Sequence, residues 1–173
     1  MEKKSTFMPS FQFGILTGLA MIIFTLIIYL LGVKQQSYWG VVNYLIFIIG
    51  IYWAMVNVRD KYLDGTMSYG KAFGSGFWVS LWAAILLGIF AFFYLKYINT
   101  GVLENAVSQA QEKMLAANPD ISDEQLDRGL AMVKMFARPG ISAITQFISN
   151  LILGILFSLI IAIFAKREDK SIA

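Results

Sequence analysis

Long apolar stretches alternate with short charged segments along this chain. Four stretches carry no charged residue at all: residues 5–33, 35–58, 72–95 and 139–165. A helix of about 20 apolar residues crosses the roughly 30 Å hydrocarbon core of a bilayer, so each stretch is long enough to span it. The pattern predicts an all-α integral membrane bundle of four transmembrane helices within a single membrane domain, residues 1–173. We place the spans at about residues 11–33, 37–58, 72–96 and 140–165.

The segment between the third and fourth spans, residues 97–138, follows a different pattern. Its apolar positions recur every three or four residues, the spacing of a helix face. They are Leu103, Val107, Ala110 and Met114, then Leu126, Leu130, Val133 and Ala137. Pro119 disfavours the helical conformation at Asn118 and ends the first helix, while Ser122 with Gln125 reads as the capping box of a second. We expect an extracytoplasmic helical hairpin.

Two interpretations of this hairpin, residues 100–137, stay open. Its two apolar stripes either pack on each other or lie against the bilayer interface, as amphipathic helices do. Alternatively, the hairpin docks a protein partner through exposed apolar anchors on one helix face. The first interpretation is the simpler one, and the hairpin is where we would look for a partner.

Composition supports a membrane location and excludes several chemistries. Hydrophobic residues make up 58% of the chain and charged residues 14%, against roughly 45–50% and 25% in soluble domains. The net charge of +3 is too small to indicate nucleic-acid binding. The chain has neither cysteine nor histidine, which removes thiolate chemistry and the commonest general base and metal ligand.

The basic residues predict the orientation. An even number of spans places both termini on one side, and short segments rich in lysine and arginine stay in the cytoplasm. One side carries Lys3, Lys4, Arg59, Lys61, Lys71, Lys166, Arg167 and Lys170 close to span ends. We therefore expect both termini and the 59–71 loop in the cytoplasm, with residues 97–138 outside.

Small and polar residues within the spans predict where the helices pack. Such residues let membrane helices approach closely, either within one chain or in a homo-oligomer, and internal packing is the default. The candidates are Gly14, Gly18, Gly70, Gly74, Asn43, Gln146, Asn150, Gly154 and Ser158. Asn43 and Gln146 fall at a similar depth, and we expect their amides to bond across the bundle, with Asn150 as a further member.

Features that are missing also restrict the function. No Asp, Glu, Lys, Arg or His lies within the four charge-free stretches, although such residues mark proton relays and ion pathways. Asp60, Asp64, Glu168 and Asp169 suggest a divalent-ion site, but basic residues interleave them, so solvated ion pairs explain them better. We predict no catalytic, cofactor-binding or metal-binding residue, and no enzyme activity.

Several stretches of the chain resemble a family of small bacterial membrane proteins. The most specific is Arg59-Asp60 followed by Asp64-Gly65-Thr66-Met67-Ser68-Tyr69-Gly70-Lys71-Ala72-Phe73; Ser122-Asp123-Glu124-Gln125-Leu126 is more generic. With the four-span pattern they are similar to domain of unknown function forty-one ninety-nine. The resemblance implies a four-helix protein of the bacterial inner membrane and assigns no activity, substrate or partner.

Three classes of function follow from these observations. The leading one is a non-catalytic interaction or accessory membrane subunit, which contacts the lipid bilayer and a partner through the hairpin or the cytoplasmic loop. The alternative is a small oligomeric transporter or channel, whose polar path would be lined by Asn43, Gln146, Asn150, Thr17 and Ser158. An intramembrane enzyme comes last, because suitable residues are missing. The direction in which the polar side chains point separates packing from transport.

Overall fold

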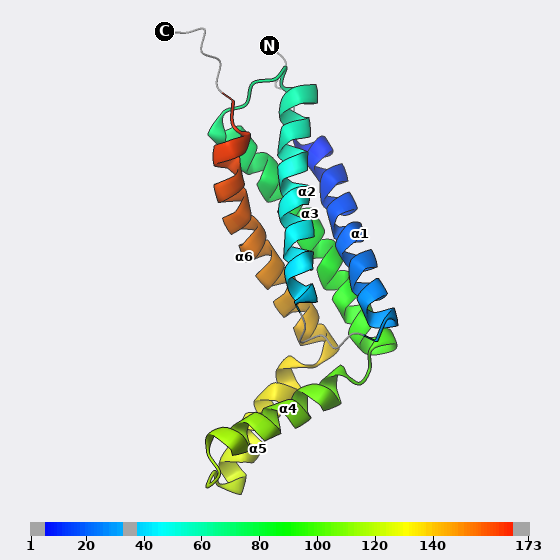
Figure 1. Cartoon of the computed structure of the whole chain (residues 1–173), viewed down its shortest axis with the longest axis vertical. Coiled ribbons are helices and arrows are strands. Elements are labelled where there is room, and N and C mark those ends of the chain that lie inside the picture. Colours follow the sequence, from blue (N-terminus) through cyan, green and yellow to red (C-terminus); the bar gives the residue numbers. More distant parts are fainter. Residues whose placement is uncertain (1–5, 33–37, 168–173) are drawn as a thin grey trace. The chain divides into compact units, whose positions relative to one another are not determined.

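A computed structural model describes residues 6–32 and 38–167, and this part of the chain is almost entirely helical. In chain order the elements are α1 (Phe7–Leu30), α2 (Trp39–Asn57), the π-helical turn η1 (Val58–Tyr62), α3 (Tyr69–Phe93), the π-helical turn η2 (Tyr94–Ile98), α4 (Val102–Ala117), α5 (Asp123–Phe136) and α6 (Pro139–Ala165) (Figure 1). The described residues form no strand; an isolated antiparallel bridge joins Met67 and Arg167. The predicted all-α class is confirmed.

Four of the helical segments are long and apolar enough to cross a membrane. They are Phe7–Leu30, Gly40–Tyr62, Tyr69–Ile98 and Pro139–Ala165. These four apolar helices, which the sequence predicted, indicate a multi-pass membrane protein. Helix α1 begins before the predicted position 11 because Pro9 lies in its first turn, where a missing N–H costs no helical hydrogen bond. The predicted span boundaries at residues 33 and 37 lie outside the described residues. So do five of the charged residues named above: Lys3, Lys4, Glu168, Asp169 and Lys170.

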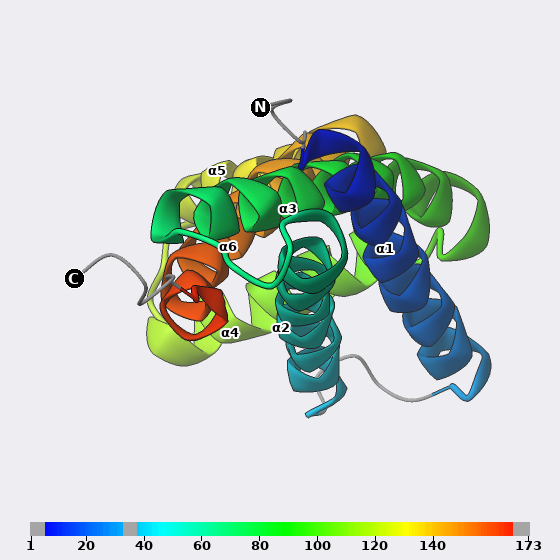
Figure 2. The ribbon, with the colours of Figure 1, turned by 90° about the horizontal axis from the view of Figure 1, so that it is seen from above.

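The described chain divides into two compact units. One contains the residues up to Leu87 and those from Phe147 onward, and the other is Gly88–Gln146. In the first unit, seen from above, α2 stands between α1 and α6 (Figure 2). It contacts both neighbours: Gly50 lies against Thr17 of α1, and Phe47 against Gly154 of α6.

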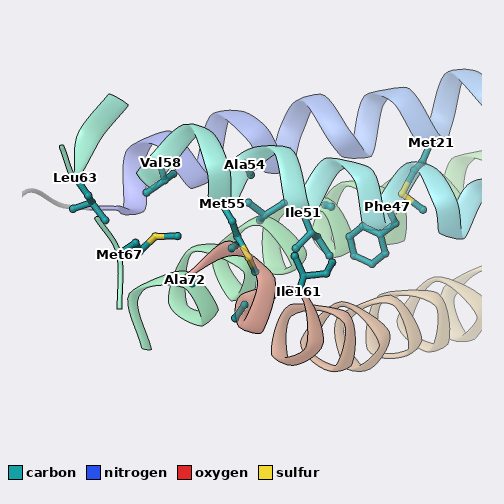
Figure 3. Close-up of a cluster of buried hydrophobic side chains, with 14 of the residues drawn as sticks. Met21, Phe47, Ile51, Ala54, Met55, Val58, Leu63, Met67, Ala72 and Ile161 are labelled. Carbon is teal, nitrogen blue, oxygen red and sulfur yellow. The ribbon is translucent and has the colours of Figure 1, made fainter. Parts of the chain in front are cut away.

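One face of α2 forms the centre of the core in the first unit (Figure 3). Its side chains Phe47, Ile51, Ala54 and Met55 have no exposed surface, and neither has Val58, the first residue of η1. The five recur with helical spacing. The other helices add smaller groups around this face: Met21 from α1, Ala72, Val79 and Ala83 from α3, and Ile161, Ala162 and Ala165 from α6.

In the second unit, α4 and α5 lie side by side (Figure 1). A methyl group at Gly129 of α5 would collide with the thioether of Met114 of α4, so the Met114 side chain packs directly on the α5 backbone there. Helix α4 ends at Ala117, and the Ser122 hydroxyl accepts a hydrogen bond from the Gln125 backbone N–H at 3.4 Å. The predicted helix end before Pro119 and the predicted Ser122 cap are both confirmed.

Candidate functional site

Buried serines join α3 to the helices on either side of it. The hydroxyls of Ser10 (α1) and Ser75 (α3) lie 2.9 Å apart, and those of Ser80 (α3) and Ser158 (α6) lie 3.4 Å apart. Ser80 also donates to the Gly76 carbonyl at 2.8 Å. All four serine side chains are fully buried. We call these four residues the serine seam; its hydroxyls satisfy one another, as buried polar groups in a bilayer must.

Glycines bring the helices together beside the seam. A Cβ atom at Gly14 would lie 2.7 Å from Trp82 Cβ and 2.9 Å from the Val79 carbonyl oxygen. One turn further along α1, a Cβ at Gly18 would meet the Leu86 side chain at 3.0 Å. The Gly-x-x-x-Gly pair of α1 therefore packs directly on α3, the arrangement that small residues permit between membrane helices.

The other predicted packing glycines differ from one another. A Cβ at Gly154 of α6 would collide with Ser80 and would lie 2.9 Å from Phe47 Cζ. At Gly70 and Gly74 a Cβ would meet no atom within 4 Å, so neither makes a close contact among the described residues. Gly76, two residues further along α3, does make a close contact, with Met55 and Ser158 as its neighbours.

The predicted amides occupy different environments. Asn43 of α2 donates from Nδ2 to the hydroxyl of Thr25 in α1 at 3.2 Å, and that hydroxyl donates to the Met21 carbonyl at 2.8 Å. Asn150 is buried, whereas Gln146 is exposed. Asn43 therefore has Thr25 as a hydrogen-bond partner, and its expected bond to Gln146 stays a prediction.

Two buried amide atoms of the first unit have no hydrogen-bond partner in the described part of the chain: Asn43 Oδ1, an acceptor, and Asn150 Nδ2, a donor. Each residue lies one helical turn before a residue of the Phe47–Gly154 contact, which places the two at the same level of α2 and α6. At this level of the two helices, Asn43 thus carries an unpaired hydrogen-bond acceptor and Asn150 an unpaired donor. Trp82 Nε1 is a third buried polar atom of this kind.

The loop between η1 and α3 closes on the end of α6, and we call this set of contacts the loop clasp. Arg59 donates from Nη1 to the carbonyl of Ala165, the last residue of α6, at 3.1 Å. The same guanidinium forms a two-pronged ion pair with Asp60, at 2.7 Å and 3.2 Å. Carbonyls at the end of a helix lack partners within it, and a cation there also complements the helix dipole.

Backbone contacts complete the clasp. Met67 and Arg167 exchange two hydrogen bonds, of 2.8 Å and 2.9 Å, and the Tyr69 hydroxyl donates to the Leu159 carbonyl at 3.1 Å. Asp64 and Gly65 have φ angles of 54° and 81°, a left-handed turn that glycine adopts without strain. The stretch from Arg59 to Phe73, which carries the family resemblance, therefore has a structural role at this end of α6.

The serine seam, the close glycine contacts and the loop clasp all hold helices together. Among residues 6–32 and 38–167, no three carboxylate, imidazole or thiol side chains come together in a way that could hold a metal ion. The sequence did not single out Ser10, Ser75, Ser80 or Gly50, although small residues within apolar spans were the available signal. From the sequence we expected Arg59 to pair with solvated carboxylates, and the ion pair between Arg59 and Asp60 agrees with that expectation. The hydrogen bond from Arg59 to the end of α6 was not predicted.

Comparisons with known proteins give one match. A search of curated proteins and a search of solved structures each found none. One family model, described as "Protein of unknown function (DUF4199)", matches residues 12–167. This range includes most of α1, all of the other helices and the whole loop clasp. The chain therefore belongs to the DUF4199 family of proteins of unknown function.

Proposed function

We propose that this protein is a non-catalytic interaction or accessory subunit of the bacterial inner membrane. Its four apolar helices form a bundle in the bilayer, both termini and the 59–71 loop lie in the cytoplasm, and α4 and α5 form a hairpin on the outer side. The basic residues near the span ends support this orientation.

The observation that carries the proposal is the inward direction of the polar side chains. Thr17, Asn150 and Ser158 are all at least nine-tenths buried within the single chain. Beside them, the serine seam is closed by hydroxyl pairs and by glycine contacts too tight for a methyl group. Polar groups packed in this way hold helices together and leave no continuous wet face, which favours attachment over transport.

Two exposed surfaces suit a partner protein. On α4, Asn105, Ser108 and Glu112 recur at positions i, i+3 and i+7, on the side away from Met114, and all three are exposed. On the cytoplasmic loop, Lys61 and Lys71 are exposed beside the clasp. We propose the α4 surface as the main partner site, because these three polar side chains are exposed on its outer side and its apolar side is already covered by α5.

The test is a purification of the tagged full chain from its native membrane in nanodiscs, followed by mass spectrometry. One variant carries Ser108→Arg with Glu112→Arg, which keeps good helix formers on α4. A matched variant carries Lys61→Glu with Lys71→Glu on the other surface. We expect a stoichiometric partner that the wild type and the loop variant retain and the α4 variant loses. Loss with the loop variant alone would move the site to the cytoplasm, and an absence of any partner would contradict the proposal.

One observation favours the alternative, a small oligomeric transporter or channel. Thr145 and Gln146 are exposed on α6, and Gln146 lies seven residues into that apolar helix, about 10 Å along its axis. Amides facing lipid are costly, so a second copy of the chain would have to cover them. A homo-oligomer without another partner in the same purification would favour this alternative, and flux measurements on that oligomer would follow.

A further inference from the structure

Helix α5 has two apolar faces, and α4 covers one of them. Leu130 is the buried residue on the covered face, with Leu126 and Val133 beside it. Met132 and Met135 lie on the opposite side of the helix, with Phe136 at the edge between the two sides, and the three are 61%, 42% and 54% exposed. We call these three residues the outer face of α5. A surface helix that needs one apolar stripe for its neighbour has no structural use for a second.

The outer face lies next to the start of an apolar span. The carbonyl of Phe136 accepts a hydrogen bond from the Ser142 hydroxyl, in the first turn of α6, at 2.8 Å. Backbone bonds from Ser142 to Arg138 (2.9 Å) and from Arg138 to Met135 (3.3 Å) close the same corner. Because Pro139 is the first residue of α6, Phe136 lies within about 10 Å of that helix's membrane boundary, the reach of three residues.

The charges of α5 also change along its axis, from acidic at its start to basic at the end near α6. Its acidic residues, Asp123, Glu124 and Asp127, occupy the first turns, and Glu124 pairs with Arg128 at 2.6 Å. The end near α6 carries exposed Lys134, followed by exposed Arg138. Apolar side chains with basic neighbours are the composition of helices that lie in the headgroup region of a bilayer.

The end of η2, in the same unit, has a similar composition. Lys96 places its ammonium group 5.3 Å from the Phe92 ring centre and 5.2 Å from that of Tyr97. Tyr97 is 64% exposed and stacks on Phe93. Aromatic and basic residues gather at the ends of spans, where their rings sit at the headgroup level. Both chain segments that connect α4 and α5 to apolar spans thus carry interfacial residues.

We propose that the outer face of α5 is a binding surface for the phospholipid bilayer. Met132, Met135 and Phe136 enter the boundary between headgroups and acyl chains, and Arg138, in the corner between α5 and α6, contacts lipid phosphates. The occupant is lipid rather than protein because the Phe136–Ser142 hydrogen bond ties the outer face to the first turn of a membrane helix, and because the end of α5 nearest that helix is basic while its acidic residues lie in the first turns. This inference rests on the membrane placement proposed above and assigns the other face of the hairpin, on α4, to the protein partner.

The test uses the absence of cysteine from the chain. Single substitutions Met132→Cys and Phe136→Cys introduce a spin label on the outer face, in the full chain reconstituted into nanodiscs of phosphatidylcholine and phosphatidylglycerol. Ser108→Cys on α4 is the water-exposed control, and Ile144→Cys on α6 is the lipid-exposed control. Power saturation then compares accessibility to oxygen, which concentrates in lipid, with accessibility to a water-soluble nickel chelate.

We expect the labels at residues 132 and 136 to be several-fold more accessible to oxygen than to the chelate, as at residue 144, and the label at 108 to show the reverse. Chelate accessibility at 132 and 136 equal to that at 108, with 144 still lipid-like, would overturn the lipid surface and leave the membrane placement intact. A water-accessible label at 144 would overturn the placement itself. Labels at 132 and 136 that are shielded from both reagents only in native membranes would show a protein partner there and would also overturn the proposal.

Discussion

The sharpest test of the helix packing is to add one methyl group to different glycines. Gly14→Ala places that methyl 2.7 Å from Trp82 Cβ and 2.9 Å from a backbone carbonyl of α3. Neither atom can rotate away, so α1 and α3 have to separate. Gly74→Ala makes the same chemical change on α3, where nothing lies within 4 Å.

The two substitutions should change the free energy of unfolding in opposite directions. Overpacking a close contact costs about 1–3 kcal/mol, whereas replacing an uncrowded helical glycine with alanine gains up to about 1 kcal/mol. For a chain of this size, 1 kcal/mol corresponds to about 2–4 °C in Tm. We expect Gly14→Ala to melt at least about 2 °C below Gly74→Ala. Gly18→Ala should fall between them, because its nearest neighbour is the flexible end of the Leu86 side chain, at 3.0 Å.

The assay is thermal unfolding of the purified chain in one detergent, followed by intrinsic tryptophan fluorescence. Trp82 lies directly beside Gly14, so the reporter is at the perturbed contact. Wild type and Gly74→Ala serve as controls for expression and detergent effects. Equal melting temperatures for Gly14→Ala and Gly74→Ala would refute the close approach of α1 and α3, and with it the reasoning from glycine spacing.

Three further predictions address other contacts. Arg59→Ala leaves the last carbonyl of α6 without its charged donor, and we expect a loss of about 1–3 kcal/mol, measured by thermal unfolding; an unchanged Tm would contradict the clasp. Asn43→Leu and Thr25→Val each remove the same hydrogen bond, so the double variant should lose little more than the worse single variant, and strictly additive losses would contradict the pair. For the topology, Lys134→Cys should react with an impermeant thiol reagent in intact cells and Lys61→Cys only after permeabilisation; the reverse pattern would invert the orientation.

The helices and their ends were predictable from the sequence because they depend on local chemistry. A bilayer sets the length of a span whatever its neighbours are, so charge-free stretches located all four apolar helices. Proline at 119 and serine at 122 act on their own backbone, so the end of α4 and the start of α5 were also predictable. The π-helical turns that lengthen the second and third spans left no such signal, and the predicted ends fell short there.

The contacts were less predictable because they depend on how each helix is rotated about its axis. The spacing of Gly70 and Gly74 resembles that of Gly14 and Gly18, yet the close contact of α3 falls at Gly76, on another side of the helix. The partner of Asn43 is likewise decided by which face of α1 turns toward α2. Such rotations follow from the packing of all the helices together, which periodicity in one span does not encode.

The loop clasp has a consequence for the order of folding. Arg59 and the carbonyl it binds are 106 positions apart in the sequence, so closing this contact carries the entropic cost of a very long loop. Contacts between α1 and α2 join much nearer residues and can form earlier. Docking of α6 is then a late step. Before α6 docks, the backbone groups of Met67 and Arg167 can form hydrogen bonds to water, because they lie at the end of a span. Leaving them without each other therefore costs little free energy until the helix is in place.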